Sequence, residues 1–430
     1  MKDITVFWFR RDLRLDDNKG LYYALKENKN ILPIFIYDKN ILDKLNKNDH
    51  RVEFINQSLK EINFVLSKNN KEISIFYDKP EKVFNHLIAE HEIKNIYLNK
   101  DYTPYAIKRD NTIKNLCKKN GIVFNEYKDH VLFEKSEIVK DDGLPYKVYT
   151  PYSRKWLSNM PKTKITTYQS ETLTKNLVAN DNKFDFSSMG FVKSNIPTPK
   201  TNISKKIIDN YENVRNFPEI DGTSKIGVHL RFGTLSTRKL INLARTSENI
   251  TFLKELIWRE FFQQILYHFP KTVQYSFKPK YDRIEWINNK DEFKMWCEGK
   301  TGYGLVDAGM RELNQTGFMH NRVRMLVGSF LCKHLLIDWR LGEAYFREKL
   351  FDYETASNVG NWQWVAGCGV DASPYFRIFN PYEQIKKFDK NLNYIKKWVP
   401  EFESNNYVGT IVEHKFARNR CLETYKKALV

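Results

Sequence analysis

The chain has 430 residues, of which 41% are apolar, and it carries a net charge of +18 at neutral pH. A chain of this length can bury a large core and can form two or three domains. No apolar run approaches the roughly 20 residues of a membrane span, and the N-terminal residues lack the pattern of a secretion signal, so we expect a cytoplasmic globular protein with no membrane partner.

The five cysteines are scattered along the chain and include no CxxC pair. This spacing argues against a disulfide framework and against a thiolate metal site. We expect reduced, mostly buried thiols and no bound metal.

The positive charge favours a polyanionic partner such as DNA. Lysines outnumber arginines by 50 to 20, and a lysine-rich, generally solvated surface would also explain the charge. Twelve of the arginines nevertheless fall between Arg215 and Arg377, and arginine is the side chain that binds phosphate with two parallel hydrogen bonds. We therefore favour nucleic acid as the partner.

Between Ile4 and about Tyr127, apolar strand-like runs alternate with amphipathic stretches; the runs are ITVFWF, ILPIFIY, EISIFY, NIYL and IVFNEY. This alternation is typical of a parallel sheet covered by crossover helices. We predict that residues 1–127 form an α/β domain with a doubly wound parallel sheet. The segment contains neither GxGxxG nor GxxxxGKS/T, so no glycine-loop site for a dinucleotide or a nucleoside triphosphate is predicted there.

From residue 128 to residue 200 the periodicity is lost, which predicts an interdomain connector. From residue 201 to residue 430 the apolar pattern is helical and predicts an all-α domain; the clearest segments are ITFLKELIWREFFQQILYHF, YGLVDAGMRELNQTG and NRVRMLVGSFLCKHLLI. Seven of the nine tryptophans lie between Trp258 and Trp398. Core packing explains any single one of them, but filling space does not require so many.

Three motifs in the helical half are candidates for a functional site. In DYETASNVGNWQW, residues 352–364, Trp362 and Trp364 are two apart; on a helix they point about 200° away from each other and cannot line the same pocket wall. HNRVRM opens an apolar helix on which Asn321, Arg324 and Met325 share one face, and such a polar, cationic patch needs a partner. GTSKIG, residues 222–227, could present N–H and hydroxyl groups to a pyrophosphate, although an ordinary turn also explains it.

Taken together, these segments resemble the cryptochrome and photolyase family, most closely the photolyases that repair cyclobutane pyrimidine dimers. The matching motifs run through essentially the whole chain: FWFRRDLRLDDN, YENVRNFPEIDGTSKIG, ELIWREFF, DRIEW, TGYGLVDAGMRELNQTGFMHNRVRM, LLIDWRLGEAYF, NVGNWQWVAG, PYFRIFNP and IVEHKFARN. The resemblance implies an N-terminal α/β antenna domain and a C-terminal all-α domain that binds folded FAD. It also implies a carbon–carbon lyase, in which light drives an electron from reduced FAD to a flipped-out dimer, the ring splits, and the electron returns.

The resemblance further implies which residues hold the cofactor: Tyr211, Thr223, Ser224, Lys225, Ile226, Gly227, Arg259, Arg324, Asp352, Tyr353, Glu354 and Asn358. An arginine beside an acid near the flavin ring would let an anionic, reduced flavin persist, because a buried anion needs a compensating charge. Asn358 matches the position facing flavin N5, where plant cryptochromes carry Asp. An amide cannot deliver a carboxylic proton, which favours anionic reduced FAD as the active form.

The catalytic residues implied in the same way are Trp286, Trp339 and Trp362, which match the family's electron relay, together with Asn358 and Glu255. The residues that would bind the lesion and the DNA backbone are Arg215, Glu255, Trp258, Asn321, Arg322, Met325 and Trp364. We expect a monomer that binds damaged double-stranded DNA and has no protein partner.

Other interpretations stay open. A cryptochrome-type blue-light receptor would signal without repair, but such receptors often carry a long tail, and only about 30 residues follow Pro400. A flavoprotein that binds nucleic acid structurally would leave Trp364 and Asn321 without a role. Folate-binding relatives carry Glu where Ala106 stands in DYTPYAIKRD, so a second, antenna chromophore would be a deazaflavin or another flavin, if one is present.

Overall fold

The computed structural model describes residues 3–179, 184–199 and 203–429. Contacts divide the chain into two compact units. The sheet unit comprises Met1–Ile138, Trp156–Lys200 and Ile226–Thr246, and the helical unit comprises Val139–Lys155, Thr201–Lys225 and Ser247–Val430. The chain therefore passes between the units several times, and the division at 1–127, 128–200 and 201–430 stays a prediction.

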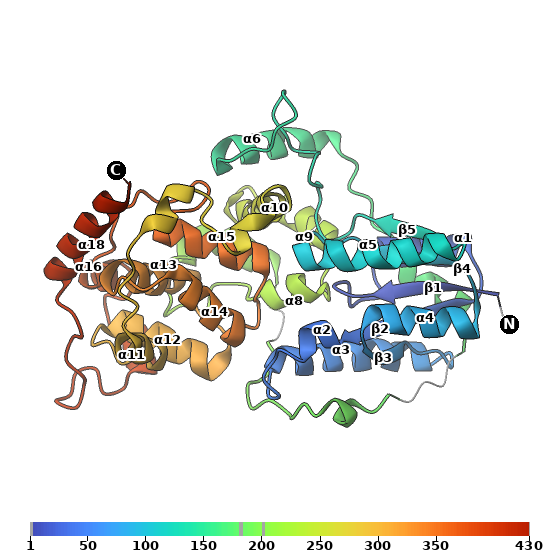
Figure 1. Ribbon diagram of the computed structural model, residues 1–430, viewed down its shortest axis with the longest axis horizontal. Coiled ribbons are helices and arrows are strands. Elements are labelled where there is room, and N and C mark those ends of the chain that lie inside the picture. Colours follow the sequence, from blue (N-terminus) through green and yellow to red (C-terminus); the bar gives the residue numbers. More distant parts are fainter. Residues whose placement is uncertain (1–2, 180–183, 200–202, 430) are drawn as a thin grey trace. The chain divides into compact units, whose positions relative to one another are not determined.

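The sheet unit is built on five parallel strands in the order β3-β2-β1-β4-β5 (Figure 1). The strands are β1 (Asp3–Phe9), β2 (Ile31–Asp38), β3 (Ser74–Asp78), β4 (Glu92–Asn99) and β5 (Val123–Tyr127). In the central strand, Val6 is paired with Leu32 on one side and with Ile96 on the other. Each strand coincides with one of the five apolar runs, and the predicted doubly wound parallel sheet is confirmed.

Helices connect these strands and cover the sheet (Figure 1). They are α1 (Lys19–Glu27), α2 (Lys39–Leu42), α3 (His50–Ser67), α4 (Pro80–Glu90) and α5 (Pro104–Lys119). Successive strand residues point to opposite faces, and both faces are apolar because helices cover both. On one face Trp8 packs edge-on against Phe84 of α4, with ring centroids 5.0 Å apart.

A later segment of the chain joins the sheet unit through a buried ionic network. This segment contains α8 (Gly227–Phe232) and α9 (Thr237–Ala244). Arg238 of α9 and Arg14 both donate to Asp129, at 2.7 and 2.6 Å, and Asp129 is only 2% exposed. Although burial raises the pKa of Asp129, the two guanidinium groups hold it below its usual value. Breaking such a pair would leave an uncompensated buried charge, so the network fixes this segment to the sheet.

Between β5 and residue 199, the described residues form the helix α6 (Tyr149–Asn159), whose residues are divided between the two units, and the short 3-10 turns η1 (Met160–Lys162), η2 (Ser170–Asn176) and η3 (Phe186–Met189).

The helical unit contains α7 (Lys205–Val214), α10 (Thr251–His268), η4 (Pro270–Val273), η5 (Pro279–Arg283), α11 (Lys290–Glu298), α12 (Gly304–Thr316), α13 (Asn321–Ser329), η6 (Phe330–His334), α14 (Trp339–Lys349), α15 (Thr355–Ala366), α16 (Pro381–Phe388), α17 (Asn393–Trp398) and α18 (His414–Leu429). The all-α prediction for this half is thus confirmed. Its core includes three fully buried or nearly buried tryptophans, Trp296, Trp339 and Trp362.

One predicted helix changes character before its end. The pattern over 321–337 predicts a continuous helix, whereas α13 ends at Ser329 and continues as a single π-turn, η6. Arg420 of α18 donates to the carbonyl of His334 at 2.6 Å, and Lys333 donates to the carbonyl of Tyr375 at 2.8 Å. These tertiary hydrogen bonds hold the end of the π-turn in place of further helical hydrogen bonds. The chain then turns at Leu336, where φ is +49°.

Within the part of the chain that the structure describes, no helix is long and apolar enough to cross a membrane. The same ranges contain no cluster of three or more His, Cys, Asp or Glu side chains arranged to hold a metal ion.

Candidate functional site

Arg324 and Asp352 form an ion pair with two parallel hydrogen bonds. Arg324 Nη1 and Nη2 donate to the two carboxylate oxygens at 3.2 and 3.0 Å, and Nε donates to the carbonyl of Met319 at 2.6 Å. The side chains are 23% and 22% exposed, so a ligand can reach the pair. With three of its donors engaged, the guanidinium is a cation of fixed position.

Asn358, one turn into α15, is oriented by Glu343 of α14. Its Nδ2 donates to the Glu343 backbone carbonyl at 3.1 Å and to Glu343 Oε1 at 3.0 Å. A backbone carbonyl only accepts hydrogen bonds, so this contact identifies the amide nitrogen. Oδ1 accepts none from the described residues and is left as an acceptor for an N–H of a ligand. Burial raises the pKa of Glu343, opposed by Arg347 and by the bond from Asn358.

Glu354, the residue before α15, turns its carboxylate toward α10. Gln263 Nε2 donates to Glu354 Oε1 at 2.6 Å, and Arg259 Nε lies 3.8 Å from Oε2. Glu354 is 5% exposed. The neighbouring Tyr353 hydroxyl lies 3.2 Å from the hydroxyl of Thr355. Two of the predicted cofactor residues, Arg259 and Glu354, are therefore neighbours.

The stretch from Thr223 to Lys225 has the form of an anion-binding turn. Lys225 has a φ of +49°, a left-handed conformation that is uncommon outside glycine. No described residue accepts a hydrogen bond from the N–H groups of Thr223, Ser224 or Lys225, and successive free N–H groups in such a turn suit a phosphate. Lys225 Nζ lies 2.7 Å from Asp221. Ile226 and Gly227 follow as the N-cap and first residue of α8, in the sheet unit.

Cations gather around the N-terminus of α13. His320, the N-cap of α13, is 4% exposed, and its Nδ1 accepts from the N–H of Arg322 at 3.2 Å. Burial, followed by the charges of Arg324, Arg322, Lys225 and Arg215, lowers the pKa of His320 to about 4. Since Nδ1 accepts, the ring proton is on Nε2, which has no partner among the described residues. The site thus combines a positive potential with an unsatisfied donor.

Trp258 of α10 lies in an aromatic stack. Its ring is parallel to that of Tyr149, with centroids 3.6 Å apart and an interplanar angle of 5°, and Phe262 follows at 5.5 Å. Tyr149 is held in place because its hydroxyl donates to the carbonyl of Lys254 at 2.9 Å and its N–H donates to Asp371 at 3.0 Å. Tyr149 therefore fixes the plane of the Trp258 indole.

Arg215 and Glu255, both predicted to contact DNA or lesion, bind each other. Arg215 Nη1 donates to Glu255 Oε1. The guanidinium also lies 5.5 Å from the ring centroid of Tyr211, a predicted cofactor residue on α7. Burial raises the pKa of Glu255, although Arg215 opposes the change.

The remaining lesion residues lie along α13 and α15. Asn321 is exposed, whereas Arg322, Met325 and Trp364 are half-buried. Arg322 donates to Asn216, its Nη1 lies 3.9 Å from the sulfur of Met325, and it covers the ring of Phe388 at 4.4 Å. Arg322 is thus held close to α13.

The three predicted relay tryptophans differ in burial. Trp362 and Trp339 are 3% and 1% exposed, and Trp286 is half-buried against the same core. The segment after Trp286 is tied to the chain just before Trp339, because the N–H of Ile287 donates to the carbonyl of Leu336 at 2.8 Å. Trp362 is seated against Gly342, where a Cβ atom would come within 2.2 Å of its ring. One side of the predicted relay is thus buried and the other reaches the surface.

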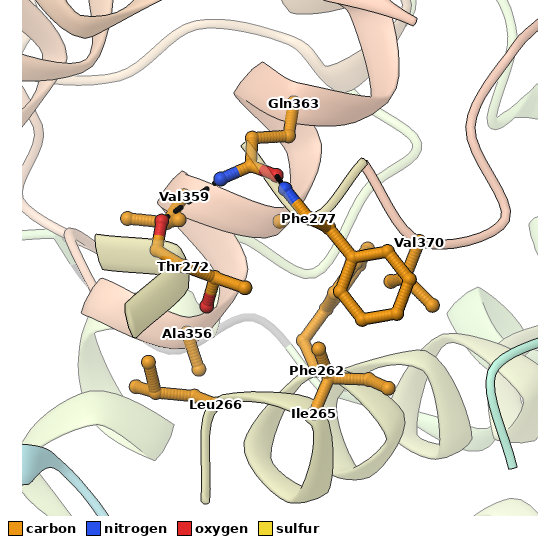
Figure 2. A pocket seen from close by; sticks show the side chains of 10 residues that line it. Phe262, Ile265, Leu266, Thr272, Phe277, Ala356, Val359, Gln363 and Val370 are labelled. Atoms are coloured by element: carbon orange, nitrogen blue, oxygen red, sulfur yellow. Dashed lines mark hydrogen bonds between the residues drawn. The ribbon is translucent and has the colours of Figure 1, made fainter. Parts of the chain in front are cut away.

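Gln363, between Trp362 and Trp364, anchors α15 to the segment after α10. Its Nε2 donates to the carbonyl of Thr272 at 2.8 Å, and its Oε1 accepts from the N–H of Phe277 at 2.8 Å (Figure 2). The same Nε2 also donates to the carbonyl of Tyr275 at 3.0 Å. Beside it lies a cavity of about 10 Å³, room for about one water, with Val359 and Phe262 among its walls. The cavity is too small for a cofactor, so its role is structural.

These groups fit FAD on their own chemistry. The unpaired N–H groups of Thr223–Lys225 and the Lys225 cation suit a diphosphate. The Arg324–Asp352 pair and the Asn358 Oδ1 acceptor suit the polar edge of a flavin ring. Buried N–H groups normally have partners, so His320 Nε2 is consistent with a ligand beside α13.

Some supporting residues have no signal in the sequence. Tyr149 lies in an aperiodic connector, 109 residues before Trp258, and Glu343 and Gln263 act through contacts with distant elements. His320 is different: it directly precedes Asn321 in the HNRVRM motif, so its place in that motif could have drawn attention to it.

Comparisons with known proteins find related families and structures. Residues 5–170 match the family described as DNA photolyase, and residues 252–406 match the FAD binding domain of DNA photolyase. The deoxyribodipyrimidine photo-lyase of Agrobacterium fabrum is 34% identical, over 98% of this chain and 97% of its own. The crystal structure of a class III photolyase from Agrobacterium tumefaciens has a TM-score of 0.86 at 31% identity, covering 100% of this chain and 98% of that one. The archaeal photolyase of Sulfolobus tokodaii, whose structure holds two FAD molecules, has a TM-score of 0.86 at 34% identity, covering 99% and 100%.

Proposed function

This chain belongs to the DNA photolyase family, and from that premise we propose that it splits cyclobutane pyrimidine dimers in damaged double-stranded DNA under light. It is a carbon–carbon lyase that uses FAD, and the predicted resemblance is confirmed. When bound, reduced FAD supplies the light absorption and the electron that opens the dimer ring. The protein's residues supply binding, orientation and electrostatics.

Around the cofactor, the residues' roles follow from their contacts. Arg324 places a fixed cation beside the flavin, and Asp352 holds that cation in position. Asn358 presents its side-chain carbonyl oxygen because Glu343 binds its amide nitrogen. An amide has no acidic proton to deliver. A cation and an acceptor at these positions favour an anionic reduced cofactor. Trp362, Trp339 and Trp286 offer oxidisable rings from the core to the surface for returning the cofactor to its reduced form.

Around the lesion, Trp258 and Trp364 offer aromatic surface and Glu255 offers a hydrogen-bonding carboxyl group. Repair of the alternative (6-4) photoproduct requires a general acid. Asn321 and Met325, which occupy the positions of the histidines in the enzymes for that lesion, cannot act as acids near neutral pH. His320 cannot replace them, since its pKa is about 4. Both positions therefore favour the cyclobutane dimer.

The observation that carries the proposal is the concentration of cations at the start of α13, where Arg324, Arg322, Lys225 and Arg215 add to the effect of burial in lowering the pKa of His320. Such a potential attracts DNA phosphates. We further propose that the protein works as a monomer in the cytoplasm; its five free cysteines are consistent with a reducing compartment.

The test is illumination of the reduced, FAD-loaded protein with defined duplexes that contain either lesion or none. We expect loss of the cyclobutane dimer and no change in the (6-4) duplex. Repair of the (6-4) product, or no repair of the cyclobutane dimer, would contradict the proposal. In parallel, affinity for the dimer duplex should fall steeply with salt, and Arg322→Ala should reduce the logarithmic slope by about one.

A further inference from the structure

The ring of His320 is bound on one side and presents a buried donor on the other. His320 is the N-cap of α13 and is 4% exposed. Its Nδ1 accepts from the N–H of Arg322 at 3.2 Å, so the ring proton is on Nε2. The two ring nitrogens point in different directions, and Nε2 therefore points away from this N–H. Nε2 has no hydrogen-bond partner among the described residues, and a buried donor of this kind requires an acceptor.

The backbone of His320 is held as firmly as its ring. Glu312 of α12 accepts from the N–H of His320 at 3.2 Å and from the hydroxyl of Tyr394 at 2.6 Å. Glu312 is itself 9% exposed. Because the backbone and the ring are both fixed, Nε2 has a defined position before a ligand binds. Such preorganisation lowers the entropic cost of binding.

The surroundings of His320 favour an anionic acceptor. Lys225 and Arg324 each lie 5.6 Å from the ring centroid of Phe318, and the charges of both act on His320. Phe318 therefore lies between Arg324 and the turn at Thr223–Lys225, and His320 follows two residues later. No described residue accepts from the backbone N–H groups of that turn, which suit a diphosphate. The donor on His320 is thus close to a second set of donors for the same kind of ligand.

A ligand that is itself buried fits this donor better than the backbone of DNA does. The chain reaches the surface at Asn321, which is exposed, and at Arg322, which is half-buried. Phosphates of a duplex outside the protein meet these two side chains, whereas His320 lies behind them in the interior. The acceptor for Nε2 is therefore expected on the cofactor.

We propose that His320 is a further cofactor-binding residue, whose Nε2–H donates to a diphosphate oxygen of FAD that is also bound by the N–H groups of Thr223–Lys225. This inference rests on the FAD site of the proposed function. A hydrogen bond to a charged acceptor is stronger than a neutral one. A neutral imidazole supplies it without adding a further positive charge beside Arg324 and Lys225. The diphosphate then joins two segments that are distant in the sequence.

The test compares the affinity for FAD of the full-length protein and of His320→Ser, after FAD has been removed and added back. Serine is a preferred N-cap residue, so this variant keeps an acceptor for the N–H of Arg322 and loses the ring N–H. We expect FAD to bind about ten- to a hundredfold more weakly, as for the loss of a hydrogen bond to a charged group. Asn289→Ser exchanges the N-cap at the exposed start of α11 in the same way and should leave the affinity unchanged.

Competition experiments locate the contact on the ligand. ADP and adenosine differ only in the diphosphate, and both can compete with FAD for the protein. His320→Ser should weaken the binding of ADP by about the same factor as that of FAD and leave adenosine unchanged. In the FAD-loaded proteins, the phosphorus NMR resonances of the diphosphate should shift in His320→Ser and stay in place in Asn289→Ser. A purely structural role of His320 would not act on the diphosphate alone.

The outcomes separate this inference from the proposed function. An unchanged affinity for FAD in His320→Ser, or an equal loss for ADP and adenosine, would overturn the contact. The contact would also be overturned if FAD binding stayed the same while affinity for the dimer duplex fell with a smaller salt slope, since the phosphate would then belong to DNA. No repair of the dimer by the wild-type protein would instead contradict the proposed function, and it would leave a diphosphate contact measured on FAD and ADP standing.

Discussion

Gly342 of α14 controls where the indole of Trp362 can lie. A Cβ atom at position 342 would stand 2.2 and 2.4 Å from Cη2 and Cζ3 of Trp362 and 2.6 Å from Cδ2 of Leu331. Both side chains are buried, at 3% and 0% exposure, so neither has room to withdraw. Overpacking costs roughly 1–3 kcal/mol, and alanine recovers up to about 1 kcal/mol of helix propensity. We therefore expect Gly342→Ala to lower the free energy of unfolding by up to about 2 kcal/mol and to turn the indole.

Urea unfolding followed by circular dichroism measures the first effect, and the near-ultraviolet spectrum of the tryptophans measures the second. Two glycines give a graded control. A Cβ at Gly328 would lie 3.1 Å from Val365, and a Cβ at Gly409 would have no atom within 4 Å. Alanine should be mildly perturbing at the first and neutral at the second. If Gly342→Ala unfolds and absorbs like the wild-type protein, the reasoning about this contact is refuted.

Three further predictions concern the site. Arg324→Met should leave Asp352 without its cation and weaken cofactor binding by about 1–3 kcal/mol. FAD should then be lost during purification, as measured by the ratio of flavin to protein absorbance, and Arg324→Lys should retain an intermediate amount. An undiminished FAD content would show that the pair does not hold the cofactor. Trp362→Phe should abolish light-driven reduction of the oxidised flavin while chemically reduced protein still repairs DNA, and fast photoreduction in this variant would exclude Trp362 from the relay. His320 has a pKa of about 4 in the folded protein against an ordinary value of 6.5, so between these pH values only the unfolded state takes up a proton. The free energy of unfolding should therefore fall by at most about 3 kcal/mol as the pH drops from 6.5 to 4. If His320→Gln shows the same dependence of the free energy of unfolding on pH, another group causes the loss of stability.

Local sequence patterns predicted the elements of the fold well. The run ITVFWF became β1 because a strand buried on both faces is apolar throughout, and the long helical pattern around Trp258 became α10. Local patterns could not predict that residues 226–246 pack with the sheet. That association depends on Arg238 meeting Asp129, 109 residues away in the chain, and no periodicity records such a pair.

The contacts of the candidate site were likewise predicted only in part. The pairing of Arg324 with Asp352 was predicted from the family resemblance and is present in the structure. In contrast, Glu255 and Arg259 are four residues apart, a spacing typical of an ion pair within one helix, whereas Glu255 binds Arg215 and Arg259 lies by Glu354. Spacing along a helix shows which residues are neighbours, but it does not show which other helix offers a better partner.

The three hydrogen bonds of Gln363 determine the rotational register of α15. A helix turns by about 100° per residue, so one inserted residue between Asn358 and Trp362 would rotate the Asn358 end by that angle relative to the anchored end. Asn358 would then leave Glu343, while Trp362 and Trp364 would keep their places. Substitutions at an exposed position of this helix, such as Asn361, leave the register intact. Over evolution, α15 should therefore vary in composition along its outer side and stay constant in length.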